Sequence, residues 1–339
     1  MTGLDHGAPP VVFVIPESDG VASGGHLYNQ RLIAALSAEG CDVRVSSFDG
    51  FVESTGNREP GHYFVDTLFL QRCVGLSIAD LDVHLLVHHL PAMSPPVPGG
   101  SAESLVAEQR VALQLFGGFL VTSEYTRDYL VEQGIGPESV VVVMPGVEVP
   151  VPRTVPEEGK LVVLIVANLI QRKQVLLLLE SLVQVVGLAH TLRFRIVGGE
   201  DLEPDYASAC RNLVREEPIL TGRVEFVGTL SHDDTMAEYA RADLFVSAAS
   251  METFGMALQE AVAAGLPVFA VKGGFVASHV RDGVNGRVFA DCRTLAHAMR
   301  ELSEDREELR SLQRSAPLVT PLGERSWAAA ARRFVAAYS

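Results

Sequence analysis

The sequence predicts an α/β fold built on two parallel sheets, and three observations carry this prediction. Short apolar stretches of strand character alternate with stretches of helical periodicity along most of the chain. The alternation breaks at a Pro-rich, polar stretch, PVPRTVPEEGK (150–160), and then starts again. The length of 339 residues is that of two domains. Alternating strands and helices form βαβ units, so each half is expected to be a Rossmann-like domain.

The first half opens with a Gly- and Pro-containing tail, MTGLDHGAPP, and then supplies one set of elements. Leucines and isoleucine recur at helical spacing in GGHLYNQRLIAALSAEG (24–40), which ends at Gly40, a common helix stop. A second helix is expected in SAESLVAEQRVALQLF (101–116). Strands are expected in PPVVFVIPE (9–17), CDVRVSSF (41–48), VDTLFLQ (65–71), VHLLVHHL (83–90), GFLVTS (118–123) and VVVVMPG, which ends at Gly146.

The second half repeats the alternation after the linker. Strands are expected in LVVLIVANL (161–169), LRFRIVGG (192–199), RVEFVG (223–228), DLFVSAAS (243–250) and PVFAV (267–271). Helices are expected in KQVLLLLESLVQVV (173–186), YASACRNLVRE (206–216), HDDTMAEYARA (232–242) and GMALQEAVAAG (255–265). Two such units suggest two domains that face each other, with ligands in the cleft at the carboxyl ends of the strands.

Charge and composition exclude several classes of protein. Residues 1–150 contain six arginines, no lysine and 18 acidic residues, a net charge of −12 within the total of −15. Nucleic-acid binding and stable association with an anionic membrane both call for basic surfaces, so neither is expected. The four scattered cysteines form no CxxC pair, which favours reduced thiols. No signal peptide or membrane span is recognised, and a cytoplasmic location is expected.

Common cofactor and catalytic motifs are missing. The chain has no G-x-G-x-x-G after its first strand, no Walker A sequence and no G-x-S-x-G. The DLD at 80–82 precedes a strand and is interpreted as a turn rather than a metal site. His88 and His89 are adjacent, so on a strand they point to opposite faces and make a poor metal pair. We expect no resident cofactor and no metal.

Two glutamates, Glu252 and Glu260, stand out in the stretch METFGMALQEAVAAG (251–265). Glu260 is the single charge between Thr253 and Val271. A helix that starts near Gly255 offers unpaired N–H groups and the positive end of its dipole to an anion such as phosphate. Glu260 lies one turn further on, where it can accept hydrogen bonds from the hydroxyls of an attached ribose. From these residues alone, a capping role for Glu252 and a solvent-facing Glu260 remain equally open.

The flanking pattern resembles the retaining glycosyltransferases of family 4, which have the GT-B fold. Their E-x7-E hallmark corresponds to Glu252 and Glu260, followed here by EAVAAGLPV, a GG pair at 273–274 and DGVNGRVF at 282–289. Further similar stretches are GGHLYNQRLIAALSAEGCDVRV, VTSEYTRDYLVEQGIGPESVVVVMPGVE (121–148), VANLIQRKQVLLLLESL (166–182) and SWAAAARRFVAAY (326–338). The resemblance therefore covers most of the chain. It implies an N-terminal acceptor-side domain (1–152), a linker (153–160), a C-terminal donor-binding domain (161–320) and a last helix (321–339) that packs back on the first domain.

The resemblance also implies roles for individual residues. Catalytic roles at the sugar fall to Glu252 and to His88, with His89 as the rival placement. The residues expected to bind the donor are Gly25, Arg172, Lys173, Phe254, Gly255, Met256 and Glu260. Among these, Lys173 is the phosphate-binding lysine, and Phe254, Gly255 and Met256 contribute backbone N–H groups. The arginine that usually accompanies the lysine falls near Asn168, a departure that Arg172 is expected to offset.

The reaction that the resemblance implies is retaining transfer of a sugar from a nucleotide-diphosphate sugar to a hydroxyl group, forming an α-type linkage without a metal. Arg172, Lys173 and the helix start would hold the charge of the leaving diphosphate. The negative first half favours a small, soluble acceptor that is neutral or cationic. Two alternatives stay open: a nucleotide-sugar epimerase of the same architecture, and a non-catalytic nucleotide-sugar-binding subunit. The donor base, the sugar, the acceptor and the oligomeric state are not predicted.

Overall fold

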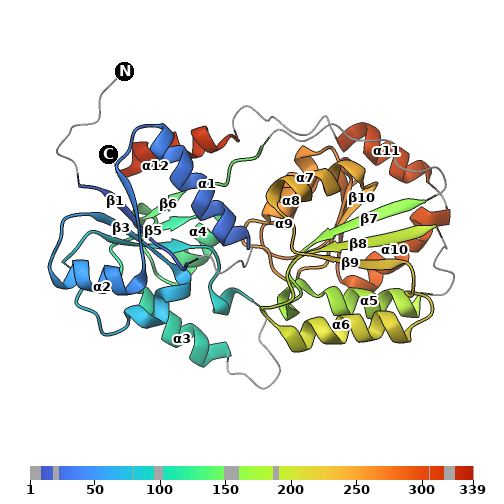
Figure 1. Ribbon diagram of the computed structural model, residues 1–339, viewed down its shortest axis with the longest axis horizontal. Coiled ribbons are helices and arrows are strands. Elements are labelled where there is room, and N and C mark those ends of the chain that lie inside the picture. Colours follow the sequence, from blue (N-terminus) through green and yellow to red (C-terminus); the bar gives the residue numbers. More distant parts are fainter. Residues whose placement is uncertain are drawn as a thin grey trace. The chain divides into compact units, whose positions relative to one another are not determined.

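The chain divides into two compact units (Figure 1). Unit 1 comprises Met1–Gly20, Gly25–Gly146 and Glu324–Ser339, and unit 2 comprises Val21–Gly24 and Val147–Gly323. The computed structural model describes residues 9–17, 23–78, 80–94, 102–148, 160–185, 191–304, 306–316 and 325–338. The linker expected at 153–160 lies outside the described residues except for Lys160.

Unit 1 contains a six-stranded parallel sheet with the order β2-β1-β3-β4-β5-β6. In register, Val12 of β1 lies opposite Arg44 of β2 on one side and Tyr63 of β3 on the other. Strands β4 and β5 are apolar and largely buried, as expected for strands covered on both faces. The strands are β1 Val11–Val14, β2 Val43–Ser46, β3 His62–Asp66, β4 Val83–Val87, β5 Gly118–Val121 and β6 Val140–Val142.

Five α-helices accompany this sheet within the described residues. Two of them begin at serine caps: Ser47 accepts a hydrogen bond from the Gly50 N–H and Ser123 accepts one from the Thr126 N–H. The helices are α1 Gly24–Ala38, α2 Phe48–Gly56, α3 Ala102–Leu113, α4 Glu124–Glu132 and α12 Trp327–Tyr338, with short 3-10 turns η1 Thr67–Cys73, η2 Pro91–Met93 and η3 Pro137–Ser139.

The prediction of a strand over residues 65–71 is wrong for most of that range. Strand β3 ends at Asp66, and Thr67–Cys73 form the 3-10 helix η1. The Asp66 carboxylate accepts a hydrogen bond from the Leu68 N–H at 2.9 Å and so caps this turn. An aspartate directly after apolar strand residues is a stop signal that the apolar pattern of VDTLFLQ conceals.

The last helix, α12, packs within unit 1, although it follows unit 2 in the sequence (Figure 1). Its Phe334 ring lies 6.0 Å from Phe13 of β1 and 4.9 Å from Phe64 of β3. Tyr338 lies 4.9 Å from the ring of His84 in β4. The helix therefore buries its aromatic stripe on one face of the sheet.

Unit 2 contains a second six-stranded parallel sheet, with the order β12-β11-β10-β7-β8-β9. Strand β7 pairs along its whole length with β8, from Leu161 opposite Leu192 to Val166 opposite Val197. Strand β10 pairs with β7 on the other side, and β10 is followed by the glutamate-containing stretch. The strands are β7 Leu161–Val166, β8 Leu192–Val197, β9 Val224–Gly228, β10 Leu244–Ser247, β11 Val268–Val271 and β12 Gly286–Phe289.

Helices cover both faces of this sheet. They are α5 Val175–Gln184, α6 Pro204–Glu216, α7 His232–Arg241, α8 Met256–Ala263, α9 Val276–His279, α10 Cys292–Glu304 and α11 Glu307–Ser315, with the 3-10 turn η4 Gln171–Lys173. Helices α5, α6, α10 and α11 share one apolar core with the sheet, and α7, α8 and α9 share the other.

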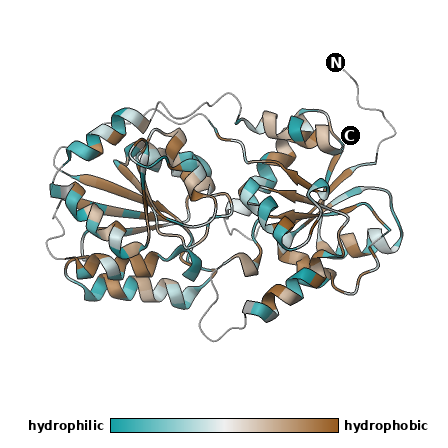
Figure 2. Ribbon diagram, turned by 180° about the vertical axis from the view of Figure 1, so that it is seen from behind, coloured by the Kyte–Doolittle hydropathy of each residue, from teal (hydrophilic) through white to brown (hydrophobic). Residues whose placement is uncertain are grey.

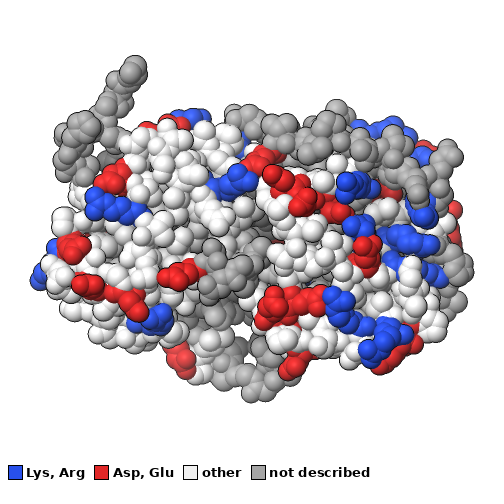
Figure 3. Space-filling model, viewed as in Figure 1, with Lys and Arg blue, Asp and Glu red and all other residues white. Residues whose placement is uncertain are grey.

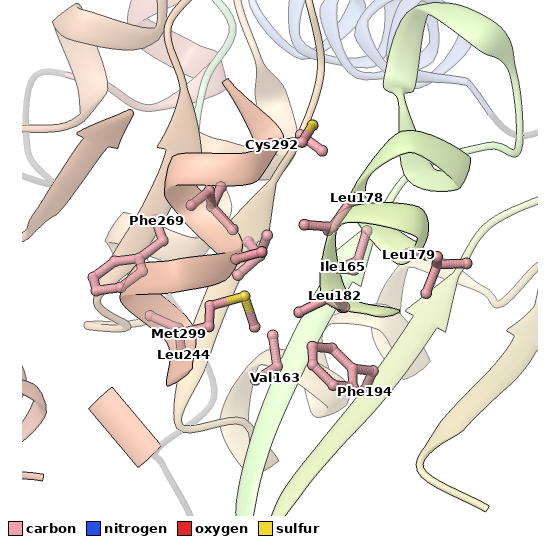
Figure 4. Packing of buried hydrophobic residues seen from close by; sticks show 14 of the residues in the cluster. Val163, Ile165, Leu178, Leu179, Leu182, Phe194, Leu244, Phe269, Cys292 and Met299 are labelled. Atoms are coloured by element: carbon pink, nitrogen blue, oxygen red, sulfur yellow. The ribbon is translucent and has the colours of Figure 1, made fainter. Parts of the chain in front are cut away.

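The first of these cores is drawn in Figure 4. Leu178 and Leu182 of α5 point toward Met299 of α10, above Val163 of β7. Alternate residues of β7 serve opposite faces, since Val163 belongs to this core and Leu164 to the other. Figure 2 shows that the strands are mostly hydrophobic, whereas the helices around them combine hydrophobic and hydrophilic residues. Parallel strands in such a sandwich end at one edge, where the loops after β7 and β10 lie side by side.

Candidate functional site

The loops after β7 and β10 are fastened together by the residues around Arg172. The Arg172 carbonyl accepts hydrogen bonds from the Ser250 N–H at 3.0 Å and the Ser250 hydroxyl at 3.2 Å. In return, the Arg172 guanidinium donates to the Met251 carbonyl at 3.0 Å. Adjacent parallel strands bring these two loops together, and the three bonds fix their register. Arg172 thus positions the loop that carries Glu252.

Lys173 and Glu252 form a buried ion pair across the same two loops. The Lys173 ammonium lies 2.6 Å from Glu252 Oε1, and the two side chains are 19% and 10% exposed. Burial alone raises the pKa of Glu252, but the charges of Lys173 and Arg172 outweigh it, so that the pKa falls below the ordinary value of 4.5. Burial lowers the pKa of Lys173, and the charge of Glu252 opposes that effect. The carboxylate is therefore held ionised beside a cation.

Helix α8 begins directly after this carboxylate. Gly255 precedes the helix with φ +88° and ψ +62°, a left-handed conformation that a side chain disfavours. The N–H groups of the first helical turn, beginning at Met256, have no partners within the helix and carry its positive dipole end. An anion at this point would meet the helix start and the cations of the neighbouring loop together.

Phe254 contributes its backbone to this loop and its side chain to the core. Its ring stacks on Phe275 with a centroid distance of 5.7 Å and meets the edge of His279 at 4.9 Å. The buried His279 donates from Nε2 to the Phe254 carbonyl at 2.7 Å, and the Phe275 N–H donates to the Glu252 carbonyl at 2.7 Å. Because a carbonyl only accepts, His279 carries its hydrogen on Nε2. The 273–279 segment therefore holds the loop before α8 in place through these two hydrogen bonds and the packing of Phe275 and His279 on Phe254.

Glu260 lies on α8, one turn beyond Met256. The buried Tyr239 of α7 donates its hydroxyl hydrogen to Glu260 Oε2 at 3.0 Å, and the Ala257 carbonyl lies 3.1 Å from the same hydroxyl. Burial and then the charge of Glu260 raise the pKa of Tyr239 well above its ordinary value, so this hydroxyl stays a donor. Glu260 is half-buried and does not simply face solvent.

Asn168 stands where the resemblance predicts an arginine, and its side chain joins two loops of unit 2. Its Oδ1 accepts a hydrogen bond from the Gly199 N–H at 2.8 Å and ties the loop after β7 to the loop after β8. The adjacent Leu169 N–H donates to the Gly199 carbonyl at 2.9 Å. Arg172 is therefore the arginine of this loop, four residues further on.

In unit 1, His88 follows β4 and forms a chain of contacts with two buried polar residues. Its Nε2 lies 2.8 Å from Asn29 Oδ1, and Asn29 Nδ2 donates to Asp66 Oδ2 at 3.0 Å. Because the carboxylate accepts, the amide oxygen of Asn29 faces the imidazole and Nε2 is the donor. Burial lowers the pKa of His88 below 6.5, although Asp66 opposes the shift, so the ring is neutral at pH 7.

Gly25 lies on α1 directly against this ring. A Cβ at Gly25 would stand 3.1 Å from His88 Cδ2, closer than an ordinary contact. Asn29 is one helical turn further along α1, which explains why both approach the same imidazole. His89, the rival placement, instead contacts the Ser94 hydroxyl through Nε2 at 3.1 Å. The geometry therefore joins Gly25 to His88 and not to His89.

The DLD stretch precedes β4, and its second aspartate contacts two histidines. Asp82 Oδ1 lies 2.7 Å from His84 Nε2, and Asp82 Oδ2 contacts His62 Nδ1. Within the part of the chain that the structure describes, no group of three His, Cys, Asp or Glu side chains is arranged to hold a metal ion. The same described residues include no helix with the length and apolar character needed to cross a bilayer.

The structure thus gathers four of the predicted residues, Arg172, Lys173, Glu252 and Gly255, at one edge of the unit 2 sheet. Phe254 and Met256 flank Gly255 there, and Glu260 follows on the same helix. Sequence reasoning missed four residues that hold these groups in place. They are Tyr239 and His279 in unit 2 and Asn29 and Asp66 in unit 1. Only Asn29 had a usable signal, since its i+4 spacing places it on the same helix face as Gly25.

Comparison with known families decides what unit 2 is. Residues 151–318 match the family Glycosyl transferases group 1. Unit 2 is a glycosyl transferases group 1 domain. The matched segment contains both glutamates, the Arg172–Lys173 loop and the start of α8.

Two curated relatives share parts of the sequence. The sulfoquinovosyl transferase SQD2 of Arabidopsis thaliana is 34% identical over 97 residues, which are 27% of this chain and 19% of that protein. A GDP-mannose-dependent alpha-mannosyltransferase of Corynebacterium glutamicum is 39% identical over 61 residues, 18% of this chain and 15% of that protein. The aligned segments therefore span less than a fifth of these relatives.

Solved structures match the fold over almost the whole chain. Sucrose-phosphate synthase from Thermosynechococcus elongatus superposes with a TM-score of 0.79 at 20% identity and covers 97% of this chain and 98% of that one. Anabaena HepE in complex with UDP-glucose gives a TM-score of 0.72 at 18% identity, covering 97% and 99%. At such identities the likeness establishes the fold, and the predicted two-domain α/β fold of GT-B type is confirmed.

Proposed function

We propose that this protein transfers a sugar from a nucleotide-diphosphate sugar to a hydroxyl group, with retention of anomeric configuration and formation of an α-type linkage. The observation that carries the proposal is the buried Lys173–Glu252 pair at the start of α8, inside the glycosyl transferases group 1 domain. The Lys173 cation and the start of α8 suit the diphosphate of a sugar nucleotide. The Glu252 carboxylate suits the sugar hydroxyls, and the Glu260 carboxylate suits the ribose.

The diphosphate binds to Lys173 and to the first N–H groups of α8, beginning near Phe254, Gly255 and Met256. Lys173 then exchanges its carboxylate partner for a phosphate oxygen, an equally strong charge-assisted contact. Arg172 adds positive charge while its guanidinium holds the Met251 carbonyl. These groups disperse the charge that develops on the leaving phosphate, which is the part that a metal plays elsewhere. We therefore propose transfer without a metal or a resident cofactor.

Release of Lys173 makes Glu252 available to the sugar. In the transfer step the bond from the anomeric carbon to the diphosphate oxygen breaks, and a bond to the acceptor oxygen forms on the same face. The acceptor's proton passes to the leaving phosphate. Glu252 orients the sugar hydroxyls and stabilises the positive charge at the anomeric carbon. In unit 1 we propose His88 as the sugar-contacting residue, with Gly25 leaving room for its ring.

The acceptor is proposed to be small, soluble and neutral or cationic. The first 150 residues contain no lysine and carry a net charge of −12. On the face drawn in Figure 3, most basic side chains lie over unit 2. Lipid-surface binding by charge requires clustered Lys and Arg, which this half lacks. Flotation with anionic liposomes tests the point: the protein should stay unbound, and stable binding would contradict this part of the proposal.

The transfer reaction itself is tested by incubating the purified chain with sugar nucleotides and a panel of hydroxyl acceptors in EDTA. The expected product has the anomeric configuration of the donor, as read by proton NMR. An inverted product, or transfer that returns only with Mg²⁺ or Mn²⁺, would contradict the mechanism. Isomerisation of the donor without an acceptor would identify an epimerase, and tight binding without turnover would identify a binding subunit.

A further inference from the structure

Tyr239 is a fully buried side chain of unit 2 that the transfer mechanism leaves without a role. Its hydroxyl extends from α7 to α8. A buried hydroxyl with no functional purpose is commonly satisfied by a backbone carbonyl alone. Here the hydroxyl reaches both the Ala257 carbonyl at 3.1 Å and Glu260 Oε2 at 3.0 Å. One hydrogen is thus shared between the helix backbone and the carboxylate.

We propose that Tyr239 is a positioning residue that holds the Glu260 carboxylate in the orientation that recognises the ribose hydroxyls. The inference rests on the proposed function, because it assumes that Glu260 meets a ribose. It adds a residue from a different helix and a specific consequence: Tyr239 determines how strongly the site prefers a ribose that carries its hydroxyls.

The first support is that the tyrosine cannot move away from the glutamate. Its ring is 0% exposed and packs against Phe245 of β10 at 5.7 Å. The preceding residue, Glu238, is buried and accepts two hydrogen bonds from the Arg195 guanidinium of β8, at 2.6 and 3.0 Å. This bidentate pair fixes α7 on the sheet at the very turn from which Tyr239 extends.

The second support is the chemistry of the Glu260 carboxylate, which accepts the hydrogen bond from Tyr239. A glutamate side chain on a helix has three rotatable bonds, so ordering it in a binding site costs conformational entropy. A hydrogen bond from Tyr239 to Oε2 removes much of that freedom before the ligand arrives. A carboxylate accepts about four hydrogen bonds, so a bond from Tyr239 is compatible with two more from ribose hydroxyls. The tyrosine therefore preorganises Glu260 without blocking it.

Burial keeps this arrangement in one protonation state. The pKa of Tyr239 is raised well above 10.0 by its burial and then by Glu260. The hydroxyl therefore stays protonated at neutral pH and donates to the carboxylate, and no acid-base role is expected for it.

The test compares Tyr239→Phe with the wild type in calorimetric titrations of the full chain. The probes are UDP, GDP or ADP, whichever the wild type binds most tightly, and the 2′,3′-dideoxy form of the same nucleotide. Loss of a hydrogen bond to a charged group predicts that the ribonucleotide binds about tenfold more weakly to the variant. The dideoxy nucleotide should bind both proteins equally, so that discrimination between the two probes shrinks by the same factor.

Two matched variants separate positioning from mere packing. Tyr28 is the other fully buried tyrosine, and its hydroxyl donates to the Val143 carbonyl of unit 1 at 2.9 Å. Tyr28→Phe loses a comparable bond and should leave nucleotide affinity unchanged. In a Glu260→Ala background, Tyr239→Phe should cause no additional loss, since the group that it positions is gone.

Equal losses for both probes, an unchanged ratio, or a full further loss in the Glu260→Ala background would each overturn the proposal for Tyr239. These outcomes differ from failure of the proposed function. If the wild type binds none of the nucleoside diphosphates, the donor site itself is wrong. If the wild type binds one and Glu260→Ala weakens it, the site stands whatever Tyr239 does.

Discussion

In unit 2 the charged groups of the site pair with each other, whereas in unit 1 a histidine that burial keeps neutral contacts an amide and lies 3.5 Å from a buried carboxylate. The Lys173–Glu252 ion pair is 2.6 Å long and joins two loops. His88 instead contacts Asn29, and Asn29 contacts Asp66. A buried ion pair can exchange one partner for a charged ligand, whereas a chain of hydrogen bonds between packed side chains holds its members in place. The difference teaches that the charged groups of unit 2 can exchange partners, whereas the imidazole of His88 in unit 1 is held in one orientation, as the proposed function requires.

The variant Glu252→Gln should give the largest effect and sharpen this comparison. It removes the negative charge that competes for Lys173, so we expect a nucleoside diphosphate to bind about threefold more tightly, because one charge that repels phosphate is lost. Transfer should fall by roughly 100- to 1,000-fold, the usual loss for a group that stabilises developing charge. Titration calorimetry and initial rates measure the two changes. If Glu252 were only a structural partner of Lys173, affinity and rate would both decline.

A second prediction concerns the unit 1 histidine. Gly25→Ala would place a methyl group 3.1 Å from His88 Cδ2 and displace the ring by a few tenths of an ångström. We expect kcat to fall about tenfold, since small misplacements of reacting groups are costly. Nucleotide affinity should change less than kcat, because the proposed diphosphate contacts of Lys173 and of the start of α8 belong to unit 2. Gly56→Ala is a matched control, since a Cβ there meets nothing within 4 Å. An unaltered kcat in Gly25→Ala would remove His88 from the mechanism.

These two sites also differ in how far the sequence could predict them. The E-x7-E spacing fixed the order of Glu252, Gly255 and Glu260 along one loop and one helix, so local geometry placed them. Asp66 lies in a segment without a motif, and His279 lies between two motif stretches without belonging to either, so each reaches its partner only through tertiary packing. Asp66 ends β3 and caps η1, a turn that the apolar pattern of 65–71 presented as strand. Alternating apolar stretches predicted both sheets except for β12 (Gly286–Phe289), because a buried parallel strand is usually an apolar run in the sequence.

The smallest expected effect of Glu252→Gln is on the free energy of unfolding at acid pH. The pKa of Glu252 is lowered in the folded state, so the folded protein binds fewer protons there than the unfolded chain does. The resulting stabilisation is present above pH 4.5 and disappears as the pH falls through the lowered pKa. The difference in unfolding free energy between wild type and Glu252→Gln should therefore shrink as the pH falls below 4.5. Urea unfolding at pH 7 and at several acid values measures it, and a difference independent of pH would show that the pair is not ionised.

The most direct test of the account is calorimetric titration of the wild type and Lys173→Ala with UDP, GDP and ADP in EDTA. The account predicts that the wild type binds at least one of them without a divalent metal. Lys173→Ala should bind it about 100-fold more weakly, because a charge-assisted contact is lost and Glu252 is left as an unpaired buried charge. The free nucleoside should lose little affinity in the same variant. Equal affinities of the two proteins for the diphosphate, or binding that appears only with added metal, would contradict the claim that Lys173 and the start of α8 hold the diphosphate.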